Sequence, residues 1–457
     1  MGLKEQTGKK YFIFIFDCDY VFATLLTLTL ILSLWLPYTA HGQYSIDSAI
    51  SPETSYADGL FGSSVTEVGS NGSSVFAIGA PGASDSGRVY LFDPNTGEIT
   101  SVLSSPNEST LGDFGASVDT VGDLTGDDVA EILVGAPKED GPNGTTPNAG
   151  TAYVFNGVTG SLLLQLQTGS ADLTSDRQLG SSVAGIGDVN GDNVPDILVG
   201  APNQDVSNID AAGKVYLFSG SDGVVLTSLT GAEEDGGFFG SAVARAGDIV
   251  GDATPDLLVG APRETASVAG SPVDEAGRVY IVDGETFTQT ILTSKNIESG
   301  GQFGRSVVSF QTATDPKILV GAFNEDPNGE PGGGRAYLFD GENPTSSSLT
   351  LLPPSPESGG RFGRSVAGMS DVDNDGQKDV LIGAPGESVA SNAGVGRAHI
   401  YSSSTGNLLA TLTSSNMQDG GFGTAVAGSS QPIVGAPREN GAELQSGRVY
   451  TFTPGIN

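Results

Sequence analysis

A short glycine motif recurs seven times along this chain of 457 residues, and this recurrence constrains the fold more than any other feature. A Phe-Gly or Leu-Gly pair, with valine three residues after the glycine, returns at intervals of 53 to 65 residues. The pairs are Phe61-Gly62, Phe114-Gly115, Leu179-Gly180, Phe239-Gly240, Phe303-Gly304, Phe362-Gly363 and Phe422-Gly423. Self-similarity at such a period is typical of architectures in which each repeat is one supersecondary unit.

Each unit also carries the motif Gly-Ala-Pro at the end of an apolar run. It begins at Gly79, Gly135, Gly200, Gly260, Gly383 and Gly435, and the fifth unit has the variant Gly321-Ala322-Phe323. A third apolar segment, such as 87–92, follows, and most units have a fourth, such as 224–229. Four short β-type segments without helical periodicity predict one antiparallel sheet per repeat. Seven sheets bury their faces when arranged radially, so the sequence predicts an all-β, seven-bladed β-propeller.

The two ends of the chain predict how the ring closes. The seventh unit reaches its third strand at 448–452 and stops at Asn457 without a fourth strand. The segment 44–50 precedes the first Phe-Gly pair just as the fourth strand of each earlier unit precedes the next pair. We therefore expect this N-terminal strand to complete blade seven and to close the ring.

The charge balance limits the partners. The chain has 54 acidic and 20 basic residues, so its formal net charge is -34. Such a chain repels phosphate backbones and anionic lipid surfaces, and we expect no nucleic-acid binding.

Residues 1–42 differ in character from the rest. Lysines precede a charge-free run over 20–36, and Ala40-His41-Gly42 forms a small-x-small cleavage site. This order predicts a secretory signal peptide. Because the leader is long and contains Asp17 and Asp19, an uncleaved single-span anchor is the alternative. In both cases residues 43–457 form an exported propeller that is extracellular, either secreted or on the cell surface, and it contacts a membrane only if the leader stays attached.

The mature chain offers little for catalysis. Cleavage after Gly42 removes Cys18 and Trp35 and leaves a single histidine, His399. That composition excludes a cysteine nucleophile and a histidine-rich zinc site, and one histidine does not make a convincing catalytic triad. We predict that the protein is not an enzyme and has no catalytic residues. His399 replaces the tyrosine that recurs in its strand, so we interpret it as a packing residue.

An acidic nine-residue pattern lies between the first two strands of units two, three, four and six. Oxygen side chains at positions 1, 3, 5 and 9 and a backbone carbonyl at position 7 match the six or seven oxygen ligands that Ca²⁺ prefers. Gly, Asn or Asp at positions 4 and 6 lets the loop turn tightly. The candidate ligands are Asp123, Thr125, Asp127, Val129 and Glu131; Asp188, Asn190, Asp192, Val194 and Asp196; Asp248, Asp252, Thr254 and Asp256; and Asp371, Asp373, Asp375, Gln377 and Asp379.

The four loops differ in how completely they match. Units three and six are complete, whereas unit two has Thr125, a weaker ligand, and the longer Glu131. Unit four has Val250, which offers no side-chain oxygen at position 3. The sequence thus predicts two strong Ca²⁺ sites and two weaker ones. The alternative is that these acids are turn residues that need no metal.

The order of Phe-Gly, acidic loop and Gly-Ala-Pro resembles the FG-GAP repeat of the integrin α-subunit head, over about 44–457. The resemblance implies a seven-bladed propeller whose Ca²⁺ loops face one side, whereas adhesion uses the opposite side together with a β-subunit. It also implies the metal-binding role of the aspartates named above. No further domain or membrane span follows the propeller in this sequence, so integrin-like signalling is not expected.

These features lead to an adhesion module for a protein or extracellular-matrix partner. A carbohydrate-binding propeller is the alternative, although the mature chain lacks the tryptophan on which sugars often stack. Long inserts between Gly-Ala-Pro and the third strand, at 138–150 and 263–277, are either a recognition surface or slack loops.

Two further positions recur. Arginines begin the third strands and glutamates follow the Gly-Ala-Pro turns, which we interpret as ion pairs within blades. They are Arg88, Arg278, Arg335, Arg397 and Arg448, and Glu139, Glu264, Glu325, Glu387 and Glu439.

Overall fold

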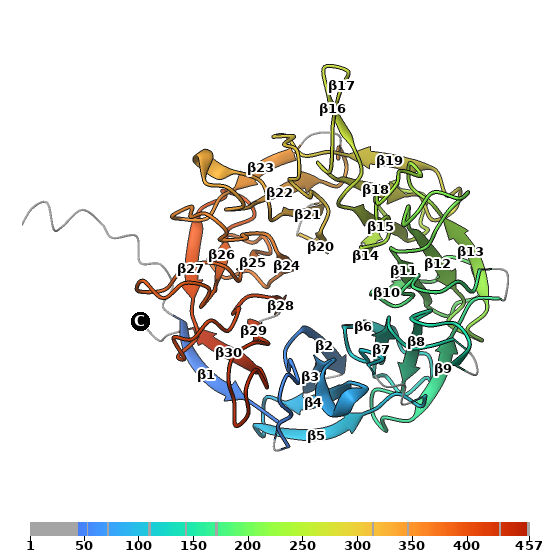
Figure 1. Cartoon of the computed structure of the whole chain (residues 1–457), viewed down its shortest axis with the longest axis horizontal. Helices are drawn as coiled ribbons and strands as arrows, with labels where there is room; N and C mark the ends of the chain where they lie inside the picture. Colours follow the sequence, from blue (N-terminus) through green and yellow to red (C-terminus); the bar gives the residue numbers. More distant parts are fainter. Residues whose placement is uncertain are drawn as a thin grey trace, which may run out of the picture. The chain divides into compact units, whose positions relative to one another are not determined.

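The computed structural model describes residues 44–454, except 53, 71–72, 108–110, 142–143, 170–171, 313–314, 345–346 and 429–430. Seven four-stranded antiparallel sheets form a ring in this part of the chain (Figure 1). The predicted all-β, seven-bladed propeller is therefore confirmed. The proposed leader at 1–42 lies outside the described residues, and within them no helix has the length and apolar character needed to span a bilayer.

Blades 1 to 4 follow one another along the chain, each with its strands in sequence order. Blade 1 contains β2 (Ser64–Ser70), β3 (Ser73–Ala80), β4 (Arg88–Asp93) and β5 (Glu98–Leu103). Blade 2 contains β6 (Ser117–Val121), β7 (Glu131–Ala136), β8 (Thr151–Phe155) and β9 (Leu162–Leu166). Blade 3 contains β10 (Ser182–Gly187), β11 (Asp196–Ala201), β12 (Lys214–Phe218) and β13 (Val225–Leu229). Blade 4 contains β14 (Ala242–Gly247), β15 (Asp256–Ala261), β18 (Arg278–Val282) and β19 (Gln289–Leu292).

Blades 5 to 7 complete the ring. Blade 5 contains β20 (Ser306–Gln311), β21 (Pro316–Ala322), β22 (Arg335–Asp340) and β23 (Ser347–Leu351). Blade 6 contains β24 (Ser365–Gly368), β25 (Val380–Ala384), β26 (Arg397–Tyr401) and β27 (Leu408–Leu412). Blade 7 contains β28 (Ala425–Ala427), β29 (Ile433–Ala436), β30 (Arg448–Pro454) and β1 (Tyr44–Ile50). A hairpin of β16 (Ala266–Val268) and β17 (Ser271–Val273) extends the insert of blade 4, and 3-10 turns η1 (Ala83–Asp85) and η3 (Pro327–Gly329) lie in two other inserts.

Burial follows the order of the strands within a blade. The first strand of each blade is innermost in Figure 1. Second strands such as β11 are buried along their whole length, because neighbouring blades cover both of their faces. Fourth strands such as β5 alternate between exposed and partly buried residues, as expected at the rim. The hydrophobic clusters form between blades: one cluster joins Leu198 and Leu217 of blade 3 to Phe239 and Tyr280 of blade 4.

The two recurring glycine motifs meet at the junction between blades. A Cβ built on Gly200, in the Gly-Ala-Pro turn of blade 3, would lie 2.1 Å from the carbonyl oxygen of Gly240 in the Phe-Gly pair of blade 4. The equivalent separation is 2.0 to 2.1 Å at all seven junctions, including Gly435 against Gly62. Two backbones that approach this closely leave no room for a side chain, which explains why both motifs require glycine.

Ring closure follows the predicted route. β1 pairs antiparallel with β30 from Tyr44 opposite Pro454 to Ile50 opposite Val449, with one register shift between Ile46 and Ser48. The strand β1 thereby supplies the fourth strand of blade 7, next to β30 at the rim in Figure 1.

Candidate metal centres

The acidic loops join the first and second strands of blades 2, 3, 4 and 6, and they lie on the same face of the propeller. We call this the loop face. The Phe-Gly pairs stand at the opposite ends of the first strands, so the Phe-Gly turns and the inserts after Gly-Ala-Pro form the other face, which we call the FG face. The structure thus collects the candidate metal ligands on one side of the ring.

The aspartate at position 1 organises each loop through its hydrogen bonds. In blade 4, Asp248 Oδ1 accepts from the backbone N–H of Gly251 (2.6 Å), and its Oδ2 accepts from that of Ala253 (3.0 Å). Equivalent bonds reach Asp123, Asp188 and Asp371 in the other three loops. These donors stabilise the carboxylate form, and the bond from Asp128 is the main reason that the pKa of Asp123 is lowered.

The acid at position 9 is fully buried and connects two segments of its blade. Asp256 Oδ2 accepts from the N–H groups of Ile249 (2.7 Å) and Val250 (2.9 Å) in its own loop. Its Oδ1 accepts from Gly284 (3.0 Å), in the turn between the third and fourth strands. The corresponding acids are Glu131, Asp196 and Asp379, each 0% exposed. Burial raises the pKa of Asp196 and Asp256, and it raises the pKa of Asp379 to about 6.

Positions 4 and 6 adopt left-handed backbone conformations in all four loops, as the turn residues predicted. Blade 6 has Asn374 (φ 61°) and Gly376 (φ 88°) there. In blade 4, Ala253 takes φ 76° at position 6. This left-handed conformation costs a residue with a Cβ roughly 1–2 kcal/mol. The blade 4 loop therefore keeps its shape although Ala253 is strained.

Two of the four loops bring three acids together. In blade 6, carboxylate oxygens of Asp371, Asp373 and Asp375 all lie within 4.8 Å of one another, and in blade 2 the same holds for Asp123, Asp127 and Glu131. In blade 3 position 3 is an amide, and Asn190 Nδ2 donates to Asp196 Oδ1 (3.2 Å). In blade 4 Val250 is 54% exposed and adds no oxygen. Blade 2, expected to be a weaker match, therefore brings three acids within the same 4.8 Å limit as blade 6.

The donor set of these loops fits a hard divalent cation. The carboxylates at positions 1 and 5 are partly or fully exposed to solvent. Within the described residues, no hydrogen bond reaches the backbone carbonyl oxygens of Val129, Val194, Thr254 and Gln377 at position 7. Carboxylates together with a free carbonyl oxygen are the ligand types that Ca²⁺ takes, and clustered like charges favour a cation.

The FG face carries the recurring glutamates, and all five of them bond to the Tyr or His of the third strand in their blade. Tyr153 donates to Glu139 (2.5 Å) and Tyr450 to Glu439 (2.6 Å). The predicted arginine pairs form in three blades, as Arg278–Glu264 (3.4 Å), Arg335–Glu325 (3.1 Å) and Arg397–Glu387 (3.6 Å). Burial nevertheless raises the pKa of Glu325 to about 7.

His399 takes the place of the tyrosine in blade 6. Its Nε2 lies 2.9 Å from Glu387 Oε2 and its Nδ1 lies 3.0 Å from Thr411 Oγ1, and the residue is 0% exposed. Both ring nitrogens are thus occupied inside the blade, as expected for a packing residue.

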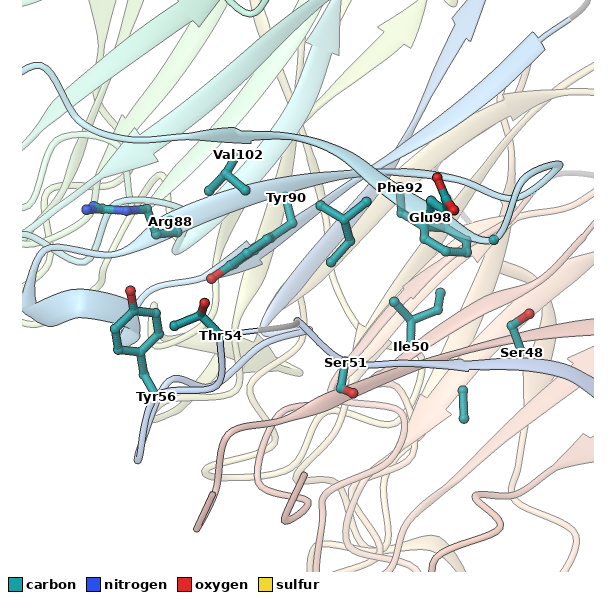
Figure 2. Close-up of a pocket in the computed structure, with 13 residues that line it drawn as sticks. Ser48, Ile50, Ser51, Thr54, Tyr56, Arg88, Tyr90, Phe92, Glu98 and Val102 are labelled. Carbon is teal, nitrogen blue, oxygen red and sulfur yellow. The ribbon is translucent and has the colours of Figure 1, made fainter. Parts of the chain in front are cut away.

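Blade 1 lacks the glutamate, and a pocket of about 720 Å³ lies beside it. Ala83 stands where the other blades have Glu or Gln, so Tyr90 has no acid beneath it. Figure 2 shows Tyr90 and Phe92 of β4 facing Ile50, Ser51 and Thr54 across this pocket. Among the aromatic residues that line the pocket, Tyr56 has a partly exposed side chain, whereas Tyr90 and Phe92 are only 5% and 2% exposed.

Two features of the sites were not predicted from the sequence. The position-9 acid was predicted only as a ligand, whereas it also holds the turn between the third and fourth strands. Two arginines, Arg305 and Arg364, line a pocket at the FG-face end of the central channel. The sequence did contain a signal for them. Both arginines directly follow a Phe-Gly pair, at the position where the other units have Ser, Ala or Thr.

Comparison with known proteins supports the repeat assignment. The sequence pattern of the FG-GAP repeat matches residues 114–155, 179–218 and 362–401, which lie in blades 2, 3 and 6. Integrin alpha-6 of Gallus gallus is 30% identical over 252 residues, covering 53% of this chain and 22% of the integrin. Integrin alpha-5 of Xenopus laevis is 31% identical over 237 residues, covering 49% and 21%. Integrin alpha-2 of Bos taurus is 27% identical over 209 residues, covering 44% and 17%.

The matched part of this chain thus spans about a fifth of the length of these relatives. No enzyme family is indicated by the repeat or by the three relatives. The chain therefore carries FG-GAP repeats in a seven-bladed β-propeller, and it is homologous to integrin alpha subunits.

Proposed function

We propose that this protein is an exported, Ca²⁺-binding adhesion module that recognises a protein or extracellular-matrix partner, without enzymatic activity. The observation that carries the proposal is the pair of three-acid clusters at the same place in blades 2 and 6. Homology supports the proposal, because integrin alpha subunits are among the relatives of this propeller. Export is proposed from the leader at 1–42, and the propeller domain is proposed to begin at Gln43.

The metal-binding residues of the proposal are those of the four loops. Asp371, Asp373, Asp375, Asp379 and the carbonyl of Gln377 would hold Ca²⁺ in blade 6, and Asp123, Thr125, Asp127, Glu131 and the carbonyl of Val129 would hold it in blade 2. Asp188, Asn190, Asp192, Asp196 and the carbonyl of Val194 form the blade 3 site, and Asp248, Asp252, Asp256 and the carbonyl of Thr254 form a weaker one. A bound ion would offset the repulsion among these carboxylates and stiffen the loop face.

The FG face is the proposed recognition surface. Its inserts vary in length, from six residues at 82–87 to thirteen at 138–150 and fifteen at 263–277, while the scaffold beneath them repeats. Variable loops on a rigid repeat scaffold commonly carry binding. In Figure 1 the hairpin β16–β17, within the longest insert, projects beyond the ring.

A carbohydrate-binding function is the second candidate, and the pocket of Figure 2 is what favours it. Arg88, Glu98 and Thr54 supply polar groups there, and Tyr56 supplies a partly exposed aromatic side chain. A sugar would need both kinds of contact. Binding to a glycan array that is lost in Tyr56→Ala would favour this function over protein adhesion.

The test of calcium binding is a titration of the exported protein. Calorimetry should find two to four bound Ca²⁺ ions, and the melting temperature should rise well above its value in EGTA. Sequencing the N-terminus of the same sample tests cleavage after Gly42. No bound ion and an unchanged melt would mean that the acids are turn residues, and the proposal of a Ca²⁺-dependent module would fail.

A further inference from the structure

A ring of valines divides the central channel of the propeller into two compartments. Each first strand contributes the valine that follows its Phe-Gly or Leu-Gly pair, and all seven line both compartments. They are Val65, Val118, Val183, Val243, Val307, Val366 and Val426. The compartment toward the loop face has a volume of about 890 Å³ and contains Glu67, Asp119, Arg245 and Lys378. The compartment at the FG face is smaller, about 240 Å³.

The FG-face compartment carries positive charge. Arg305 of blade 5 and Arg364 of blade 6 occupy the same position in neighbouring repeats and both line this compartment. Within the described residues, neither guanidinium has an ion pair or a hydrogen bond. Arg364 instead lies over the ring of Phe323, 5.6 Å from its centroid. Phe323 is the residue that replaces proline in the variant Gly-Ala-Phe motif, so this departure from the repeat supports the arginine.

The two arginines repel each other, and among the described residues neither forms an ion pair with an acid. Arg305 is the main cause that lowers the pKa of Arg364 to about 9, followed by burial and by Arg361. Burial lowers the pKa of Arg305. No carboxylate contributes at either group, although the chain has 54 acids and a formal net charge of -34. Two like charges held together without an acidic partner cost free energy until an anion binds.

The fold itself does not require these arginines. The equivalent positions hold Ser63, Ala116, Ser181, Ser241 and Thr424 in the other blades. Each of those hydroxyls bonds to the carbonyl three residues before it, as in Ser181 Oγ to Gln178 O (2.8 Å) and Thr424 Oγ1 to Gly421 O (2.6 Å). A hydroxyl at this position makes a hydrogen bond within the Phe-Gly turn. In the described part of the chain, the arginine side chains make no such bond and line the channel mouth instead.

We propose that the channel mouth binds the carboxylate of an acidic side chain presented by a protein partner. This inference rests on the proposed function, because it names the chemistry that the FG face recognises. Two adjacent guanidiniums suit a carboxylate through paired N–H···O bonds. The small volume admits one side chain, and the strongly negative charge of the rest of the chain opposes an extended polyanion.

Exposed apolar residues on the same face favour a protein as the source of this carboxylate. Leu111 and Met417, in connections that lead to first strands, are 68% and 48% exposed, and Leu444, in the insert of blade 7, is 61% exposed. Exposed apolar side chains on the same face as a polar anchor are typical of protein interfaces, and free inorganic anions gain nothing from them.

The test uses the full exported chain in Ca²⁺ and the variant R305S/R364S, which restores the serine found in blades 1, 3 and 4. Short disulfide-closed peptide loops of random sequence are selected on the wild-type protein. Selected loops should contain one Asp or Glu that Asn or Gln cannot replace, and R305S/R364S should weaken their binding on the order of 100-fold. The control R245S/K378S removes the same charge from the other compartment and should leave binding within roughly threefold.

Peptides that bind without an acid, or that bind R305S/R364S as tightly as wild type, would overturn the inference and leave the proposed function intact. A wild-type protein that selects no peptide would count against the proposed function as well.

Crystals grown with bromide test separately whether the channel mouth binds an anion. A bromide ion, located by its anomalous signal, should lie against both guanidiniums and be absent from R305S/R364S. No peak would overturn the anion site. A peak without acid-dependent peptides would mean an adventitious ion only, and the assignment to a partner's carboxylate would be wrong.

Discussion

Blades 4 and 6 carry acidic loops of equal length at the same place, 248–256 and 371–379, and the two loops are built alike. In both, the first aspartate accepts from the backbone of the following residues, and the last is buried against the turn between the third and fourth strands. They differ at position 3, where blade 6 has Asp373 and blade 4 has Val250. The comparison indicates that hydrogen bonds to positions 1 and 9 determine the loop's shape. We propose that position 3, which differs between the two loops, sets how tightly each loop would hold a cation.

The largest effect should come from removing the buried acid that both loops share. Asp256→Ala and Asp379→Ala should each lower the free energy of unfolding by about 2–3 kcal/mol in EGTA, because buried N–H groups lose a charged acceptor. Chemical denaturation measures this, with Glu285→Ala, an exposed acid, as the control. A loss in only one of the two variants would show that the loops are not built alike.

The stability that Ca²⁺ adds should differ between the loops of blades 4 and 6. At a concentration ~100 times Kd, each occupied site adds about 2.7 kcal/mol of stability, which EGTA removes. D373N, which keeps an acceptor for the N–H of Asp375, should eliminate much of the contribution of one site, and D252N in blade 4 should change it less. Calorimetric stoichiometry together with melts in Ca²⁺ and EGTA measures both. Equal losses from D373N and D252N would contradict the role given to position 3.

Adding the missing carboxylate ligand at position 3 should make the blade 4 loop bind Ca²⁺ more tightly. Val250→Asp completes the blade 4 pattern, and we expect about tenfold tighter Ca²⁺ binding there, equivalent to ~1.4 kcal/mol. Val102→Asp exchanges a similarly exposed valine on β5 and controls for the added charge. If V250D binds no more Ca²⁺ than V102D, the shape of the blade 4 loop and not its donor set limits binding.

The smallest effect concerns backbone strain at position 6. Ala253→Gly should stabilise the protein by about 0.5 kcal/mol, because relief of the left-handed conformation is partly cancelled by the greater entropy of glycine in the unfolded chain. Gly376→Ala in blade 6 should destabilise it by about 1 kcal/mol, since its φ is 88°. Denaturation in EGTA measures both, and an opposite sign for either variant would refute the assignment of strain.

The sequence predicted the number of blades, the closing strand and the positions of the loops, because each depends on residues that repeat in register. It did not predict which acids come within reach of one another. That Thr125 replaces an acid in blade 2 suggested a weak match, yet the longer Glu131 reaches Asp123 and Asp127. The arginine pair was missed for a related reason. Arg305 and Arg364 are 59 residues apart, and only the ring places blades 5 and 6 side by side.

The pairing of β1 with β30 also affects how the protein is made. Tyr44 of β1 pairs with Pro454 of β30, so β1 is synthesised long before the strand with which it pairs. Contacts of such sequence separation form late and slow folding. As the chain grows, blades 1 to 6 can assemble one after another, while β1 stays unpaired until β30 is made. A release before that point would yield an open ring with a free strand edge, which is a surface prone to aggregation.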